Sequence, residues 1–132
     1  MDKKMKKFLL ATLLMFIGIT MASAQNQAEI KFDQITINVG TFSEKAPIKK
    51  ATFTFTNTGK APLVINQVVA SCGCTVPMYD KRPIAPGQKG SINITYNGQG
   101  KFPGHFKKSI TVRTNAKTEM TRLYIEGVME AK

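Results

Sequence analysis

Residues 51–56 read ATFTFT, and residues 91–96 read SINITY. In both stretches apolar and polar side chains alternate with a period of two, and β-branched residues favour an extended backbone. Successive side chains of a strand point to opposite faces, so such a stretch buries one face and exposes the other. Both stretches are therefore predicted to be half-buried strands.

Similar patterns extend outward from these two stretches. Alternation is visible in residues 29–39 (EIKFDQITINV), 109–114 (SITVRT) and 121–128 (TRLYIEGV). Residues 63–69 (LVINQVV) are more continuously apolar, which predicts a central strand covered on both faces. No stretch after residue 24 shows a sustained apolar stripe with a 3.6-residue period, so we expect almost no helix.

Turn residues separate the predicted strands. Residues 57–59 (NTG), 86–87 (PG) and 97–104 (NGQGKFPG) hold the residue types that tight turns require. Six or seven short strands predict an all-β fold, an immunoglobulin-like antiparallel β-sandwich of about seven strands, with a barrel as the alternative. The chain has no Trp, so its core must consist of Phe, Ile, Val and Leu; the predicted members are Phe32, Phe53, Phe55, Ile65, Ile92, Ile94, Ile110, Val112, Leu123 and Ile125.

The first 24 residues have the features of a secretory signal peptide. Residues 1–7 are lysine-rich, residues 8–21 are apolar, and Ala22-Ser23-Ala24 is a small-x-small cleavage site. The apolar run is shorter than the roughly 20 residues that a spanning helix needs, which argues against the alternative of an uncleaved anchor. We therefore expect a signal peptide at 1–24, one domain at 25–132, a periplasmic or secreted location, and no stable membrane span after cleavage.

The charge of the mature chain argues against a nucleic-acid partner. Without residues 1–24 the chain has 15 Lys and Arg and seven Asp and Glu, so its net charge is +8. Specific nucleic-acid readers favour Arg, whereas here lysine outnumbers arginine twelve to three and is spread along the chain. Such a surface favours weak attraction to anionic envelope polymers. We find no Ser-His-Asp spacing, phosphate-binding Gly loop or paired carboxylates, so we expect no enzyme activity and no cofactor.

One motif could carry chemistry, residues 71–75 (SCGCT). In an extended strand, the Cα atoms of Cys72 and Cys74 would be about 6.5 Å apart, near the upper limit for a disulfide. Gly73 lacks a Cβ and could bend the chain enough to bring the sulfurs together, which makes it the candidate supporting turn. A disulfide that closes so small a ring is expected to be strained and easily reduced.

Four interpretations of Cys72 and Cys74 remain open at this stage. They are buried reduced thiols, a local disulfide, a redox pair, or a Cu(I) site completed by His105, Met78 or Met120. We favour the first two over the redox pair because no helix N-terminus is predicted that would lower a thiol pKa. We favour them over the metal site because His105 is the only histidine and no ligand spacing repeats.

The motifs together resemble a known family. Residues 53–75 with the pattern NTG-x-x-PL followed by CGCT, residues 83–87 (PIAPG), residues 109–112 and Asn115 are similar to a bacterial exported family classed as a domain of unknown function. The resemblance covers about residues 30–128, and the family is related to ASH, HYDIN and major-sperm-protein-like immunoglobulin folds. It implies a sandwich whose relatives act mainly as interaction modules, with no established catalysis and no assigned role for the Cys-Gly-Cys motif.

These observations lead to two functional hypotheses. The first is a non-enzymatic interaction module of the bacterial cell envelope, whose partner is a protein or another envelope component. The alternative is thiol–disulfide or copper handling through Cys72 and Cys74.

Overall fold

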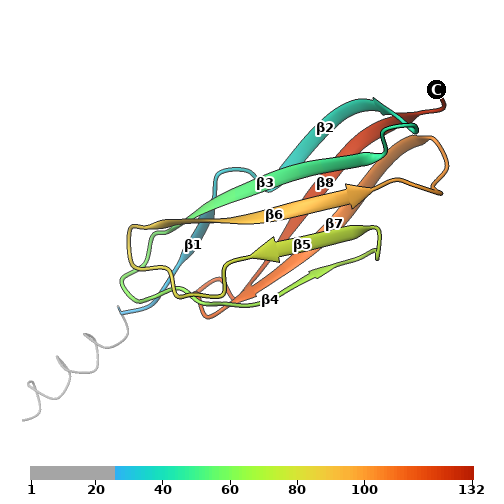
Figure 1. Ribbon diagram of the computed structural model, residues 1–132. Helices are drawn as coiled ribbons and strands as arrows, with labels where there is room; N and C mark the ends of the chain where they lie inside the picture. Colours follow the sequence, from blue (N-terminus) through green and yellow to red (C-terminus); the bar gives the residue numbers. More distant parts are fainter. Residues whose placement is uncertain (1–25) are drawn as a thin grey trace, which may run out of the picture.

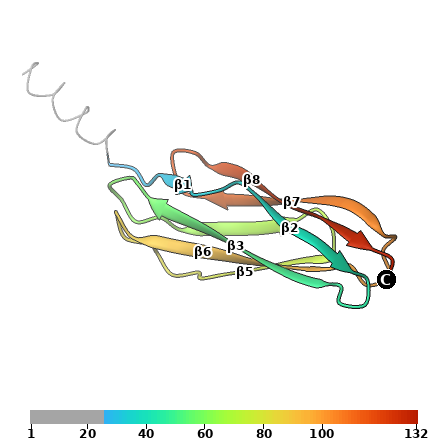
Figure 2. The same cartoon turned by 90° about the horizontal axis from the view of Figure 1, so that it is seen from above.

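The computed structural model describes residues 26–132, so the predicted signal peptide lies outside the described residues. The chain forms two four-stranded sheets packed face to face (Figures 1 and 2). The strands are β1 (Ile30–Phe32), β2 (Thr36–Ser43), β3 (Ile48–Asn57), β4 (Ile65–Ala70), β5 (Thr75–Tyr79), β6 (Lys89–Asn97), β7 (Gly104–Thr114) and β8 (Met120–Glu130). The predicted all-β, immunoglobulin-like sandwich is confirmed, and no segment within 26–132 forms a helix long and apolar enough to cross a membrane.

The sandwich has eight strands, one of whose pairings is parallel. One sheet has the order β1-β3-β6-β5 and the other β2-β8-β7-β4. The prediction that all strands are antiparallel is wrong for β2 and β8, which pair in parallel. The cause lies in residues 29–39, which form two strands in different sheets. The Asp33 N–H donates to the Thr54 carbonyl in the first sheet, whereas the Ile35 carbonyl accepts from Tyr124 in the second.

The core lies between the sheets and matches the alternation in the sequence. Nine of the ten predicted core residues are buried, and the tenth, Phe32, is half-buried with its ring edge-on to Phe55 at 5.6 Å. The core also contains Phe42 and a stacked pair, Tyr96 and Phe106, whose ring centroids are 4.0 Å apart. Phe42, Tyr96 and Phe106 are therefore aromatic core members that the predicted core did not include.

The prediction that residues 63–69 form a central strand covered on both faces is wrong. The strand begins at Ile65 and pairs only with β7, so β4 is an edge strand, and Val69 is 48% exposed. Leu63 is fully buried but lies before the strand, where its backbone exchanges two 2.8 Å hydrogen bonds with Ile84. A short apolar run indicates that some side chains are buried, but it does not show whether the strand pairs with other strands on one edge or on both.

Asn57, at the end of β3, is a fully buried polar residue that joins three segments. Its Nδ2 donates to the carbonyl oxygens of Ala61 at 2.8 Å and Ile84 at 2.9 Å. Its Oδ1 accepts from the backbone N–H groups of Gly59 at 3.0 Å and Glu29 at 3.4 Å. The side chain thus satisfies backbone groups of its own turn, of the segment before β1 and of the segment before β6. Buried polar groups are costly unless paired, so this set fixes the three segments together.

The backbone also requires glycine at two positions, Gly59 of the NTG motif and Gly87 of the PG motif. A Cβ on Gly59 would overlap the carbonyl oxygen of Gln27 and the amide nitrogen of Glu29, so only glycine fits. Gly87 has a φ of +80°, in the left-handed region, and its N–H donates to the Asn57 carbonyl at 2.8 Å. The NTG and PG motifs are therefore explained by the fold itself.

We expect Asn57→Ala to lower the free energy of unfolding by about 3 kcal/mol, because it removes all four hydrogen bonds of a fully buried side chain. Denaturant unfolding of the chain without residues 1–24 measures the loss. Asn93→Ala is the matched control, since Asn93 is exposed on β6 and, within residues 26–132, its side chain accepts only from the Thr52 hydroxyl. Equal losses in the two variants would contradict this role of Asn57.

Candidate functional site

Residues 71–74 (SCGC) form the turn between β4 and β5, and Thr75 begins β5; the two strands are edge strands of different sheets (Figure 1). Backbone hydrogen bonds attach this turn to both sheets. The Ser71 N–H donates to the Ser109 carbonyl on β7 at 2.9 Å, and the Asn97 N–H on β6 donates to the Cys74 carbonyl at 2.8 Å. The crossing between the two sheets is thus held by main-chain contacts on either side.

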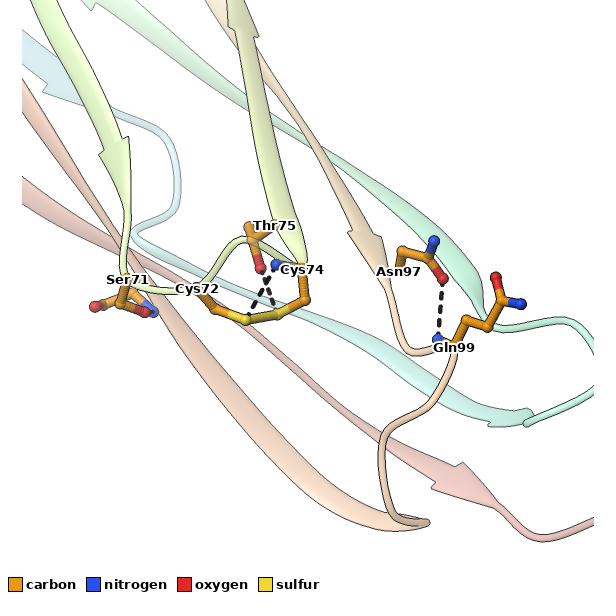
Figure 3. The surroundings of a disulfide bond; sticks show 7 residues. Ser71, Cys72, Cys74, Thr75, Asn97 and Gln99 are labelled. Carbon is orange, nitrogen blue, oxygen red and sulfur yellow. Dashed lines mark hydrogen bonds between the residues drawn. A yellow bond between two sulfur atoms is a disulfide. The ribbon is translucent and has the colours of Figure 1, made fainter.

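A disulfide joins Cys72 and Cys74, whose Cα atoms lie 5.1 Å apart (Figure 3). This separation is shorter than the extended-strand value because the chain turns here, with the Thr75 N–H donating to the Cys72 carbonyl at 3.1 Å. Of the four interpretations of Cys72 and Cys74, the structure has the local disulfide. In this form neither sulfur is a thiolate that could bind Cu(I).

The two sulfurs have different surroundings. Cys74 packs against the hydrophobic core, and its Sγ lies 3.6 Å from the hydroxyl oxygen of Thr75. A disulfide sulfur carries no hydrogen, so the hydroxyl is the donor. Thr75 is only 3% exposed, and within residues 26–132 its hydroxyl has no other hydrogen-bond partner. The Sγ of Cys72 instead accepts from the backbone N–H of Cys74 at 3.1 Å.

Thr75 is a site residue that sequence reasoning missed. Its place directly after the second cysteine was visible, but neither its burial nor the direction of its hydroxyl could be read from the motif. Figure 3 shows this hydroxyl directed at the sulfur of Cys74. The site therefore consists of two sulfurs, one of which has a dedicated hydroxyl donor.

Gly73 lies in the turn, as the sequence suggested, but the turn makes no steric demand for glycine. Its φ is outside the left-handed region, and an added Cβ would have no atom within 4 Å. The position is exposed, so the backbone between the two cysteines is open to solvent. Gly73 is thus not needed to bend the backbone. Because it has no side chain, it leaves the disulfide accessible to solvent.

The disulfide adds little to the stability of the fold. It closes a loop between residues only two positions apart, for which the loss of chain entropy in the unfolded state is worth about 1.5 kcal/mol. It links two residues of one turn and does not link one sheet to the other. The backbone hydrogen bonds of the turn would persist without it.

The other candidate ligands lie on separate parts of the sandwich. His105 is near the start of β7, opposite Val128, with its Nε2 3.6 Å from a carboxylate oxygen of Glu126. Met120 pairs with Arg113 at the far end of β7, about 26 Å along the strand from His105. His105 and Met120 are therefore too far apart to bind the same ion. Met78, the third candidate, lies on β5 and is 67% exposed. Residues 26–132 contain no cluster of three His, Cys, Asp or Glu residues suited to a metal.

A hollow with a volume of about 350 Å³ lies beside β5 and β6, apart from the disulfide turn. Asp80 is its only acidic residue, and Arg82 donates to the two carboxylate oxygens of Asp80 at 2.6 to 3.1 Å. The side-chain hydrogen bond from Arg82 is the main cause that lowers the pKa of Asp80 to about 2. This carboxylate is thus ionised and engaged at neutral pH, which makes it a poor general base. The hollow is lined by Met78, Tyr79, Asp80, Ile84, Lys89, Gly90, Ser91 and Asn93.

The positions of these motifs agree with a comparison to known families. Residues 30–129 match the family described as "Protein of unknown function (DUF1573)". This chain belongs to that family. The resemblance seen in the NTG, CGCT and PG motifs is therefore confirmed, and no curated protein sequence matches the chain.

Solved structures support the fold assignment. A protein of unknown function from Porphyromonas gingivalis W83 is similar with a TM-score of 0.67 and 16% identity, over 79% of this chain and 48% of its own. An ASH/PapD-like domain of human CEP192 has a TM-score of 0.64 and 8% identity, over 81% of this chain and 89% of its own. The periplasmic chaperone SfaE has a TM-score of 0.55 and 10% identity, over 78% and 58%. The relation to ASH-type domains is thus confirmed at the level of the fold.

The chain spans only about half the length of the Porphyromonas protein. Two Vibrio cholerae proteases, VesC and VesB, also contain a region of this fold, but this chain spans only 24% and 34% of them. A shared fold at such low identity assigns no activity.

We expect the Cys72→Ser, Cys74→Ser double variant to keep the sandwich and to lose no more than about 2 kcal/mol of unfolding free energy, because the turn has its own backbone hydrogen bonds. Denaturant unfolding followed by circular dichroism measures this loss. Wild-type protein unfolded with and without a reductant provides the control and should show the same difference. A variant that is unfolded in the absence of denaturant would show that the disulfide holds the fold.

Proposed function

We propose that this chain is an exported, non-enzymatic interaction module of the bacterial cell envelope. Its partner would be a protein or another envelope component. The observation that carries the proposal is Phe102, whose side chain is 96% exposed in the loop between β6 and β7. A Phe side chain left in water lacks the roughly 2 kcal/mol of hydrophobic stabilisation that its burial would give. Aromatic residues are frequent anchors of protein interfaces.

The loop presents Phe102 through local hydrogen bonds. The Lys101 N–H donates to the Gly98 carbonyl at 3.0 Å, and the Gln99 N–H donates to the side-chain oxygen of Asn97 at 3.0 Å. Gly100 adopts a φ of +77°, which glycine accommodates without strain. An anchor that is ordered before binding loses less conformational entropy when the partner arrives.

The surroundings of the loop suggest an extended contact surface. Asn97, where β6 ends, donates to the Cys74 carbonyl, so the loop starts beside the disulfide turn. The β2–β3, β4–β5 and β6–β7 connections and the C-terminus gather at this end of the sandwich (Figure 1). A partner that contacts Phe102 could therefore reach several connections at once.

Three further observations support export and binding. The basic, apolar and small-residue segments of residues 1–24 have the order that signal peptidase substrates require. Among the similar folds are an ASH/PapD-like domain and a protein named as a periplasmic chaperone. The net charge of +8 on the remaining chain suits a compartment rich in anionic polymers.

A photoreactive amino acid placed at Phe102 in bacteria that export the protein should give a discrete crosslinked adduct in the envelope fraction. The same amino acid at Lys89, exposed at the start of β6 and at the opposite end of the sandwich, should give none. Intact mass of the recovered chain should correspond to a start at Gln25. Equal adducts at both positions would contradict a binding surface at Phe102, and retention of residues 1–24 would contradict cleavage of the signal peptide.

A further inference from the structure

We propose that the Cys72–Cys74 disulfide is a thiol-exchange site with a fixed direction: an incoming thiolate attacks Cys72, and Cys74 leaves. This inference does not depend on the interaction proposed above. It rests on three features of the turn, which are the small disulfide ring, the packing of Cys74 but not of Cys72 against the hydrophobic core, and the hydroxyl of Thr75.

The ring makes the disulfide reactive without making it important for the fold. Cysteines two positions apart close a small ring, and small rings open readily in exchange because they restrict the disulfide geometry. The hydrogen bonds from Ser71 to Ser109 and from Asn97 to Cys74 remain when the ring opens. Reduction would therefore be a local event.

The exposure of the turn favours attack at Cys72. Ser71 and Gly73, the residues on either side of Cys72, are exposed, and no atom lies within 4 Å of the space that a Gly73 side chain would occupy. Cys74 instead packs against the hydrophobic core. An attacking thiolate must approach along the sulfur–sulfur axis, so attack on Cys72 comes from the side of the cysteine that is not packed against the core.

The hydroxyl of Thr75 favours Cys74 as the leaving group. A thiolate leaves faster when its pKa is lower, and a hydrogen bond to the charged form lowers that pKa. The Thr75 hydroxyl is buried, lies 3.6 Å from the Cys74 sulfur and has no other partner within residues 26–132. The Cys72 sulfur, by contrast, has a backbone donor within the turn, the Cys74 N–H at 3.1 Å, and no side-chain donor within residues 26–132.

The exchange proceeds in two balanced steps. A reductant thiolate forms a bond to the Cys72 sulfur, the bond between the cysteines breaks, and its electron pair stays on Cys74. A second thiolate then attacks the reductant sulfur of this mixed disulfide and releases Cys72 as a thiolate. Two thiols are oxidised to one disulfide, the protein disulfide is reduced by two electrons, and the two cysteines take up the two protons.

The direction of attack can be measured on the oxidised protein with glutathione. The reaction is quenched with acid, free thiols are alkylated, and peptide mass mapping locates the glutathione. We expect at least a ten-fold excess on Cys72 over Cys74, whereas the isolated oxidised peptide of residues 71–75 should show no such preference. An even distribution in the folded protein, or an excess on Cys74, would overturn the proposal.

The role of Thr75 has a separate test. Thr75→Val keeps the shape of the side chain but removes the donor, and it should slow reduction by dithiothreitol about five-fold. Thr75→Ser keeps the hydroxyl and should restore the rate. Circular dichroism establishes that both variants are folded, and equal rates in wild type and the two variants would show that the hydroxyl has no part in exchange.

The same assay distinguishes the source of the thiol. Glutathione and a reduced thioredoxin-type protein dithiol are compared at equal thiol concentration. Faster reduction by the protein dithiol assigns a protein partner, and faster reduction by glutathione assigns a low-molecular-weight thiol. If neither reduces the folded protein faster than the peptide of residues 71–75, the site is not an exchange site.

Discussion

The side chain of Asn57 is the interaction on which the rest of the structure depends. Four backbone groups from three segments are hydrogen-bonded to this one fully buried amide. Gly59 allows the segment before β1 to approach, and Gly87 closes the turn that donates back to Asn57. The NTG and PG motifs are therefore explained by one buried polar contact at one end of the sandwich.

The CGCT motif has a different character. Its disulfide joins residues of a single turn that backbone hydrogen bonds already hold, so the fold does not require it. Gly73 likewise meets no steric demand. A motif that the fold does not need is a candidate for chemistry. The buried hydroxyl beside Cys74 is the specific feature that indicates which chemistry, since it has no evident structural purpose.

Alternation in the sequence was enough to predict the two-layer fold and ten core residues of which nine are buried, although these nine are only half of the 18 buried apolar residues within residues 26–132. It failed where the outcome depends on neighbours in space. Residues 29–39 alternate throughout, but nothing in the pattern shows that the chain changes sheets between Asp33 and Ile35. Residues 63–69 are apolar, but the edge position of β4 is set by the order of the strands. Phe102 and Thr75 could not be recognised because exposure of a loop residue and direction of a hydroxyl are properties of the folded chain.

The central claim is that the disulfide can open while the sandwich stays intact. Amide resonances recorded by two-dimensional NMR in glutathione buffers of decreasing potential test it most directly. The account predicts that shifts on reduction are confined to residues 71–75 and their partners Asn97 and Ser109, while core residues such as Phe53 and Ile92 are unchanged. Shift changes throughout both sheets, or loss of resonance dispersion on reduction, would contradict it.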